Sequence, residues 1–395
     1  MFNRKMAIYW FISFLLASYF LTLKNFRSES NDSNYYNELV VRYHNQDWKT
    51  VFTPKWGENI YGFDPSTYMR DQLPGQTLMG IALTKMGVPA THALYILEMA
   101  FQILSIFLFV QIAQYFWEQK KATVLFYSLL LIPMAFSYNI RANHESGIMF
   151  CSLLALYSGL KMGHSSKWII LAALASFGLL WIKGPFFIFG FILMTIGYFY
   201  SQEKNKSSLT LLAAYFLSIV FILISAICFE LVTRKLTGTS FFLEFWSIQI
   251  QQRAIGLTQK HHFIIQKMIN FYYYFSHYLA YALPWSLLLI IFIIKNLKTS
   301  AFFKNCFTFI KSPLSQCMLS AAMSFCLLFS LSDRVAGRYT FPGYYMFTAW
   351  VVLFLYDQSL TFKAIHEKLV KKGLHFIVPG LWLLAFGLHF LKKHA

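Results

Sequence analysis

Residues 208–232 read SLTLLAAYFLSIVFILISAICFELV, with Glu230 as the only charged residue. A membrane-spanning helix needs about 20 mostly apolar residues, because the hydrocarbon core is about 30 Å thick and a helix rises about 1.5 Å per residue. This stretch meets both requirements. It therefore predicts a transmembrane helix.

Further apolar runs of similar character occur along the whole chain. They lie at about 6–23, 92–117, 122–139, 147–162, 168–182, 184–200, 276–294, 314–331, 339–356 and 373–391. Together with residues 208–232 they predict about 11 transmembrane helices. The run at 75–90 is shorter and contains Lys85 and Pro89, which favours a helix lying at the membrane interface.

The composition of the whole chain supports the same interpretation. Of its 395 residues, 57% are hydrophobic and 13% are charged, and the mean hydropathy is +0.50. A soluble domain carries about 25% charged residues. The net charge of +18 would suggest a nucleic-acid partner only in a soluble protein. We therefore expect an all-α membrane protein, a single polytopic domain over residues 1–395 that binds no nucleic acid.

Basic residues in short loops predict the orientation. Arg4 and Lys5 precede the first run, which lacks a small-residue cleavage site and is interpreted as a retained span. Short loops on the same side carry further lysines such as Lys120. Because such loops face the cytoplasm, we expect a cytoplasmic N-terminus in the cell inner (plasma) membrane. The large loops at about 24–91 and 233–275 are then extracytoplasmic, and we expect the site on their side.

Asp32 is the first candidate for chemistry, because it lies in the first large loop soon after the first span. A carboxylate at the membrane surface can take a proton from an incoming hydroxyl or amine, which is the role of a general base. Asp is also common at helix N-caps, so Asp32 could instead cap a helix that begins near Ser33.

Arg141 and Glu145 form a second candidate group directly after the run at 122–139. A charged side chain at mid-bilayer costs about 2.5–3.5 kcal/mol, so these residues either line a polar cavity or anchor the chain at the interface. His144 between them has no second histidine at helical spacing, and the five cysteines show no metal or disulfide spacing. No metal ligands are predicted, although a divalent metal stays possible.

Several cations could bind a phosphate. Lys183 stands before Gly184-Pro185 between two apolar runs, where the chain can turn sharply. Arg334 and Arg338 lie in another predicted outside turn and could clamp a phosphate with two hydrogen bonds each. Arg253 in the second large loop could join them. Each of these residues could also anchor a lipid headgroup.

The order of these motifs resembles the membrane glycosyltransferases that use a lipid-linked sugar, the superfamily of protein O-mannosyltransferases and aminoarabinose transferases with a GT-C type fold. The matching elements are Asn31-Asp32 at an acidic pair, Tyr35 at a tyrosine, Asp47-Trp48 at an Asp-Trp, Asp71-Gln72-Leu73-Pro74-Gly75 at an Asp-x-Pro-Pro-Gly, Arg141 to Glu145 at an Arg-x-x-x-Asp, Leu180 to Pro185 at a Leu-x-x-Lys-Gly-Pro, and Pro284-Trp285 and Ser330 to Pro342 at two later elements. Asn31, Leu73 and Glu145 depart from the pattern, where an acid, a proline and an aspartate would stand.

The resemblance implies inverting transfer of a hexosyl or pentosyl group from a polyprenyl phosphate to a lipid, protein or glycan acceptor at the extracytoplasmic face. Asp32 would be the catalytic base. A phosphate leaving group needs positive charge more than a general acid. The substrate-binding candidates are Tyr35, Asp71, Arg141, Glu145, Lys183, Arg253, Arg334, Arg338 and Tyr339. No nucleotide-binding loop is found, which fits a donor that arrives through the membrane.

Two other classes of protein stay open at this point. A transporter or lipid flippase would also have many spans and buried charges, but it would favour matched repeats and charges near the midplane. Here the charges concentrate on one face, in a long first loop. A non-catalytic assembly subunit would be favoured if Asp32 were dispensable.

Overall fold

The computed structural model describes residues 31–55, 66–70, 73–117, 125, 129, 141–203, 207–247, 263–332 and 336–372. Every regular element in these ranges is a helix, and one isolated β-bridge joins Lys55 to Tyr68. The spans expected at 6–23 and 373–391 lie outside the described residues, as does the span expected at 122–139 except for Leu125 and Leu129.

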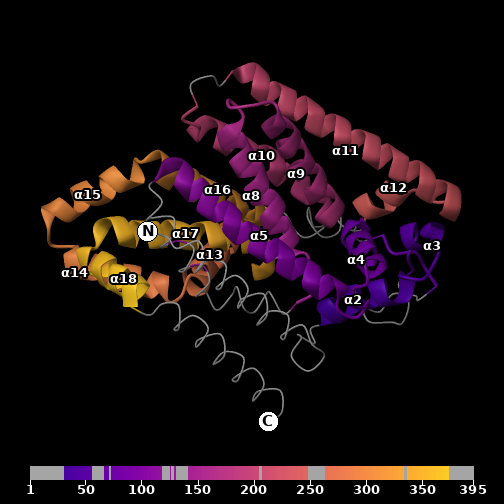
Figure 1. The fold of residues 1–395 in the computed structure, drawn as a ribbon, viewed down its shortest axis with the longest axis horizontal. Helices are drawn as coiled ribbons and strands as arrows, with labels where there is room; N and C mark the ends of the chain where they lie inside the picture. The colour runs from indigo at the N-terminus through magenta and orange to yellow at the C-terminus, as the bar shows by residue number, and fades with distance from the viewer. Residues whose placement is uncertain are drawn as a thin grey trace, which may run out of the picture.

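Three helices of the first large loop lie together beside the N-terminal half of the next helix (Figure 1). They are α2 (Asn31–Tyr43), α3 (Trp48–Phe52) and α4 (Gly75–Lys85), and α5 (Ala93–Phe116) follows them. Asp47 caps α3, because its Oδ1 accepts a hydrogen bond from the Thr50 N–H at 2.8 Å. The helix expected at 75–90 is present as α4, which ends at Lys85.

The middle of the chain forms a bundle of long helices, α8 (Glu145–Lys161), α9 (Lys167–Lys183), α10 (Phe187–Tyr200) and α11 (Ser208–Thr237). The short 3₁₀ turn η1 (Gly184–Phe186) reverses the chain between α9 and α10, and Gly184 has a positive φ of 53° there. Gly190 of α10 packs directly on Ser176 of α9, so the two helices lie side by side (Figure 1). Small residues allow this close approach.

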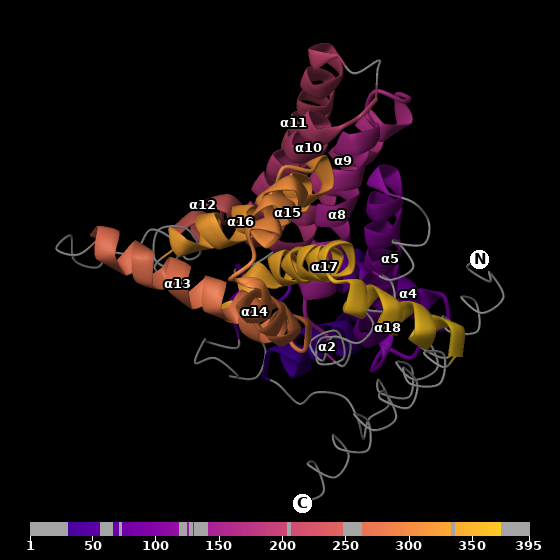
Figure 2. The same cartoon turned by 90° about the vertical axis from the view of Figure 1, so that its left-hand side faces the viewer.

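The last part of the described chain contains a broken helix. The single helix expected over 276–294 is wrong in form: α13 (Phe263–Tyr281) and α14 (Trp285–Asn296) meet at an angle of 96°. Pro284 lies at this break. Proline has no backbone N–H, so it cannot donate the hydrogen bond that a continuous helix needs there. Figure 2 shows α13 and α14 around α17.

The remaining elements include α12 (Phe241–Phe245), α15 (Ser300–Ile310), α16 (Pro313–Ser330), the 3₁₀ turn η4 (Gly337–Thr340), α17 (Phe341–Gln358) and α18 (Leu360–Lys372). Within the described part of the chain, four helical stretches are long and apolar enough to cross a membrane: Ala93–Phe116, Lys167–Tyr200, Ser208–Thr237 and Pro313–Ser330. The second is α9 and α10 taken together, by length and composition only, although the chain reverses between them at η1. The α13–α14 pair adds a fifth if it is one broken span. The structure is therefore that of an all-α membrane protein.

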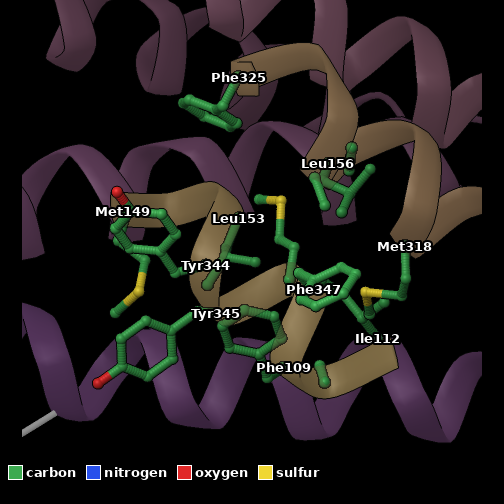
Figure 3. Close-up of a cluster of buried hydrophobic side chains, with 14 of the residues drawn as sticks. Phe109, Ile112, Met149, Leu153, Leu156, Met318, Phe325, Tyr344, Tyr345 and Phe347 are labelled. Atoms are coloured by element: carbon green, nitrogen blue, oxygen red, sulfur yellow. The ribbon is translucent and has the colours of Figure 1, made fainter. Parts of the chain in front are cut away.

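The largest hydrophobic core lies where α5, α8, α16 and α17 meet (Figure 3). It includes Phe109, Met149, Leu153, Met318 and Phe347, and α10 joins it through Phe189, which stacks on Phe325 with ring centroids 4.0 Å apart. In a membrane such packing stabilises the bundle mainly by van der Waals contact. This core fixes the helix ends that carry the polar residues described next.

Candidate functional site

The segment 141–144 and the first turn of α8 form the centre of a buried polar cluster. Asn143, His144, Glu145 and Ser146 are each at most 4% exposed. Buried polar groups cost free energy unless they are hydrogen-bonded. Four of them in succession at one end of an apolar bundle therefore need partners or a ligand.

The first turn of α2 docks on this segment. The Ser33 hydroxyl donates to Asn143 Oδ1 at 2.9 Å and accepts the Ala142 N–H at 3.3 Å. One turn later the Tyr36 ring meets the His144 ring edge-on, with centroids 4.3 Å apart. Asp32 belongs to the same first turn of α2, although its side chain lies outside the described residues.

The surroundings of His144 favour its neutral imidazole form. Its burial lowers its pKa well below the usual value, and the charge of Lys183 lowers the pKa further. A neutral imidazole offers no positive charge to a phosphate at neutral pH. The cations of the site must therefore come from other residues.

Two carboxyl groups meet in the cluster. Glu98 of α5 is 1% exposed and Glu145 of α8 is 4% exposed, and Glu145 is close enough to act electrostatically on Glu98. The charges of Lys183 and Arg141 act on Glu145. Glu145 Oε2, Gln76 Oε1, Ser146 Oγ and His144 Nδ1 are buried without a hydrogen-bond partner among the described residues. Such a partly satisfied polar cluster is typical of a site that holds a polar ligand or water.

Two cations from distant parts of the sequence come together around one aromatic ring. Lys183 ends α9 at the Gly184 turn, and its Nζ lies 5.7 Å from the centroid of the Tyr339 ring. Arg338 Cζ lies 5.8 Å from the same centroid. Phe329 stacks on Tyr339 with centroids 5.6 Å apart and so supports the ring. The arrangement provides positive charge for an anionic group.

The turn that carries Arg338 is fastened to α13. The Ala336 N–H donates to the Tyr274 hydroxyl at 3.3 Å, and Asn270 Nδ2 donates to the Ser332 carbonyl oxygen at 2.8 Å. The Tyr344 hydroxyl of α17 donates to the Gly337 carbonyl oxygen. Arg338 therefore has a fixed backbone position.

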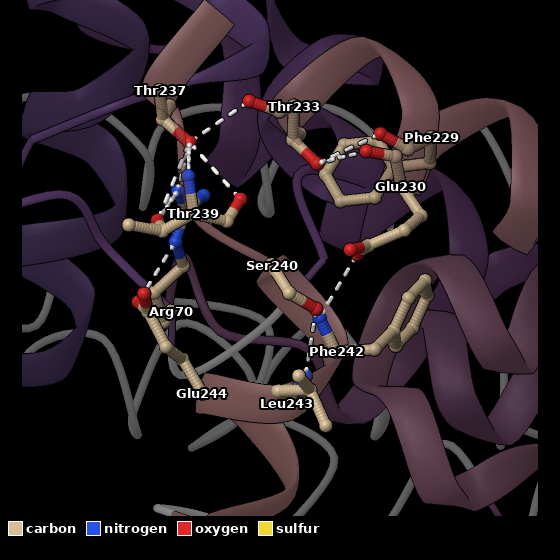
Figure 4. A network of polar contacts seen from close by, with 10 residues as sticks. All are labelled: Arg70, Phe229, Glu230, Thr233, Thr237, Thr239, Ser240, Phe242, Leu243 and Glu244. Carbon is tan, nitrogen blue, oxygen red and sulfur yellow. Dashed lines mark hydrogen bonds and ion pairs between the residues drawn. The ribbon is translucent and has the colours of Figure 1, made fainter. Parts of the chain in front are cut away.

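Arg70 joins the two predicted large loops (Figure 4). It is 2% exposed, its Nε donates to Glu244 Oε2 at 3.2 Å, and a terminal nitrogen donates to Thr237 Oγ1 at 2.9 Å. Through Glu244 it holds α12, whose Phe245 packs on Gly184 beside Lys183. Arg70 is thus a structural support next to the cation pair.

The predicted site residues fall into three groups. Arg141, Glu145, Lys183, Arg338 and Tyr339 lie in the connected region just described. Tyr35 is buried elsewhere in α2, where its hydroxyl donates to Met69 Sδ at 2.7 Å, and its predicted substrate contact stays a prediction. Asp71, Arg253, Arg334 and the side chain of Asp32 lie outside the described residues.

Sequence reasoning missed Glu98 and Gln76. Glu98 is the only charged residue in the apolar run at 92–117, and a charged residue inside a span marks a functional position by default. That signal was available, whereas Gln76 carried none. Among the described residues, no group of three or more His, Cys, Asp or Glu is placed to hold a metal ion.

Comparisons with known proteins find similarity in structure alone. No protein-family model and no curated protein sequence matches the chain. The crystal structure of ArnT from Cupriavidus metallidurans in the apo state superimposes with a TM-score of 0.60 at 15% identity, over 92% of this chain and 62% of that one. The crystal structure of the same ArnT bound to undecaprenyl phosphate gives 0.64 at 13% identity, over 97% of this chain and 75% of that one.

The chain therefore has the fold of ArnT, and the expectation of an all-α membrane fold of GT-C type is confirmed. At this identity the likeness concerns the fold. The chain spans less than two thirds of the length of the apo ArnT chain.

Proposed function

We propose that this chain is an integral membrane glycosyltransferase that moves a sugar from a polyprenyl phosphate to an acceptor at the extracytoplasmic face, with inversion. One observation carries the proposal. Lys183 Nζ and Arg338 Cζ lie 5.7 Å and 5.8 Å from the centroid of the Tyr339 ring in a chain with the fold of ArnT, and one ArnT structure is bound to undecaprenyl phosphate.

The two cations would stabilise the leaving phosphate. As the bond between the anomeric carbon and the phosphate oxygen breaks, negative charge grows on the phosphate, and fixed positive groups lower the energy of that state. Lys183 and Arg338 are held by the Gly184 turn and by the contacts of the 336–340 turn. Arg253 and Arg334 are proposed to join them. The polyprenyl tail would lie among the exposed apolar side chains of the bundle.

Asp32 is the proposed catalytic base. The acceptor hydroxyl or amine loses its proton to the carboxylate, the acceptor atom bonds to the anomeric carbon, and polyprenyl phosphate leaves. The docking of Ser33 on Asn143 supports this role, because it sets the first turn of α2 beside the segment that carries Arg141 and Glu145. These two residues, with Tyr35, Asp71 and Tyr339, are the proposed contacts to the sugar and the acceptor.

The location follows from the distribution of lysines and arginines. A single polytopic domain in the inner membrane, with a cytoplasmic N-terminus, would set both large loops and the site on the extracytoplasmic face. Partners would be the lipid-linked donor, a lipid, protein or glycan acceptor, and membrane lipids.

The proposal is tested by offering radiolabelled polyprenyl-phosphate sugars to membranes that contain the protein. We expect covalent transfer of label to an acceptor, and loss of this transfer in Asp32→Asn while the protein stays inserted and folded. Retained transfer in Asp32→Asn would remove the base assignment. A labelled lipid that crosses sealed vesicles without any covalent transfer would instead support the flippase reading.

A further inference from the structure

Glu98 is buried in a spanning helix, yet its carboxyl group is fully engaged by donors from other helices. Its Oε2 accepts the Ser146 N–H at 2.9 Å, and its Oε1 accepts Gln76 Nε2 at 2.7 Å. An ionisable side chain is costly to bury inside a membrane-spanning helix, so the presence of Glu98 there calls for a specific role.

The N-terminus of α8 explains the need for an acceptor. The first N–H groups of a helix have no partner within the helix, and this end carries partial positive charge. His144 occupies the N-cap position of α8 but makes no capping hydrogen bond through its side chain. Glu98 reaches across from α5 and accepts one of these N–H groups, so the cap comes from a neighbouring helix.

Gln76 extends the same contact to the segment before α8. Its Nε2 donates both to Glu98 Oε1 and to the Asn143 carbonyl oxygen. This double donation fixes the orientation of the Gln76 amide group, because a flipped amide would set an oxygen against the Asn143 carbonyl. Helices α4 and α5 together therefore hold residues 143 and 146 on either side of Glu145.

We propose that Glu98, with Gln76, is a positioning pair that fixes Arg141 and Glu145 relative to Lys183 and so sets the geometry of the donor site. The proposal rests on the proposed function for the identity of that donor. Within the described residues, the hydrogen bonds of the pair join Glu98 and Gln76 to each other and to the backbone of Asn143 and Ser146, and not to the cations. The pair acts through the backbone at residues 143 and 146.

Both side-chain oxygens of Glu98 must act as acceptors, one for the Ser146 N–H and one for Gln76 Nε2. In Glu98→Gln the side chain keeps its shape but must turn an NH₂ group toward either the Ser146 N–H or the Gln76 amide. One buried donor then faces another and an acceptor is lost, which corresponds to roughly a 10-fold change in local equilibria. Glu98→Asp keeps two acceptor oxygens and should restore part of the effect.

Gln102 supplies the matched control. It lies one turn further along α5, is also fully buried, and donates to the Tyr345 hydroxyl instead of to α4 or α8. Gln102→Met should therefore perturb packing inside the bundle while the start of α8 stays pinned. Gln76→Met is the second test variant, since it leaves Glu98 its contact with Ser146.

The first measurement is hydrogen–deuterium exchange of the full-length purified protein and its variants. The second is the binding of undecaprenyl phosphate, compared among variants that have the same thermal unfolding temperature as the wild type. We expect peptides covering 141–150 to exchange at least about tenfold faster in Glu98→Gln, less so in Glu98→Asp and Gln76→Met, and unchanged in Gln102→Met. We expect the dissociation constant for undecaprenyl phosphate to rise by about tenfold in Glu98→Gln. In the other variants it should rise only if their exchange over 141–150 has also become faster.

The outcomes separate this inference from the proposed function. Unchanged exchange in both Glu98→Gln and Gln76→Met overturns the positioning pair. Faster exchange with an unchanged dissociation constant shows a cap without influence on the donor site, which also overturns it. If the wild-type protein does not bind undecaprenyl phosphate while exchange still rises in the variants, the pinning of 141–145 stands and the proposed donor is wrong.

Discussion

The two ends of α8 differ in how they treat polar side chains. At the C-terminal end, Lys161 pairs with Glu203 at 3.2 Å and lies 4.5 Å from the Tyr115 ring. Ser201 Oγ donates to the Leu160 carbonyl oxygen at 2.6 Å. At this end the charges are opposite, partly exposed and paired.

At the N-terminal end the arrangement is the reverse. Two carboxyl groups, those of Glu98 and Glu145, are buried close to each other, and several polar atoms there have no partner within the described residues. A fold gains no stability from such a grouping. The polar groups at the C-terminal end are satisfied by the protein itself, whereas those at the N-terminal end fit the ligand site that we propose there. Substitutions at one end of α8 can therefore be compared with matched substitutions at the other end.

The largest effect is expected at Lys183. Lys183→Ala removes one of the two cations around Tyr339 and should lower sugar transfer by about 100-fold or more, because it removes charge stabilisation of the leaving phosphate. Transfer from labelled polyprenyl-phosphate sugars measures the effect. Lys161→Ala at the opposite end is the control and should leave transfer unchanged; equal losses in both variants would contradict the contrast.

Glu145→Gln should separate activity from stability. Removing a carboxylate that is buried beside Glu98 should raise the unfolding free energy by about 1 kcal/mol, while transfer falls by about tenfold. Thermal unfolding in detergent and the transfer assay give the two values. A loss of stability together with full activity would mean that Glu145 serves the bundle instead of the ligand.

His144 should make stability depend on pH. Because its pKa in the folded protein is lowered, the unfolded chain binds the extra proton first, and stability falls as pH decreases below about 6.5, by at most about 1.4 kcal/mol per pH unit. His144→Gln should flatten this part of the stability curve. The exposed His164 near the other end is the control, and His164→Gln should leave the curve as it is.

The smallest effect is expected from the ion pair at the C-terminal end. Glu203→Gln breaks a partly exposed pair and should cost at most about 1 kcal/mol of unfolding free energy, with no change in transfer. High salt should reduce the difference between this variant and the wild type, since salt screens surface charges. A larger loss that persists at high salt would show that this end carries more than a surface pair.

The sequence was sufficient for features that depend on the local pattern. Apolar length located α5, α11 and α16, and the Lys183-Gly184-Pro185 motif located the turn between α9 and α10. The break at Pro284 was missed because the apolar run continues across it, and hydropathy does not register a lost backbone hydrogen bond. The chain therefore bends between α13 and α14 at a place where the residues on both sides are apolar.

The site was predictable only in part, because its contacts are tertiary. Glu145, Lys183 and Arg338 were found as charged residues next to apolar runs. The link between Glu98, Gln76 and Ser146 joins three helices, and no spacing in the sequence encodes it. Asp32 stays a prediction, since the structure describes its backbone and not its side chain.

The central claim is that a polyprenyl phosphate binds at the N-terminal end of α8 and not at the C-terminal end. It is tested most directly by crosslinking the protein to undecaprenyl phosphate that carries a photoreactive group next to the phosphate, and then identifying the labelled peptides. We expect label on the peptides around Lys183 and Arg338, competed away by unlabelled undecaprenyl phosphate. Label concentrated around Lys161 and Glu203, or spread evenly along the lipid-facing helices, would contradict it.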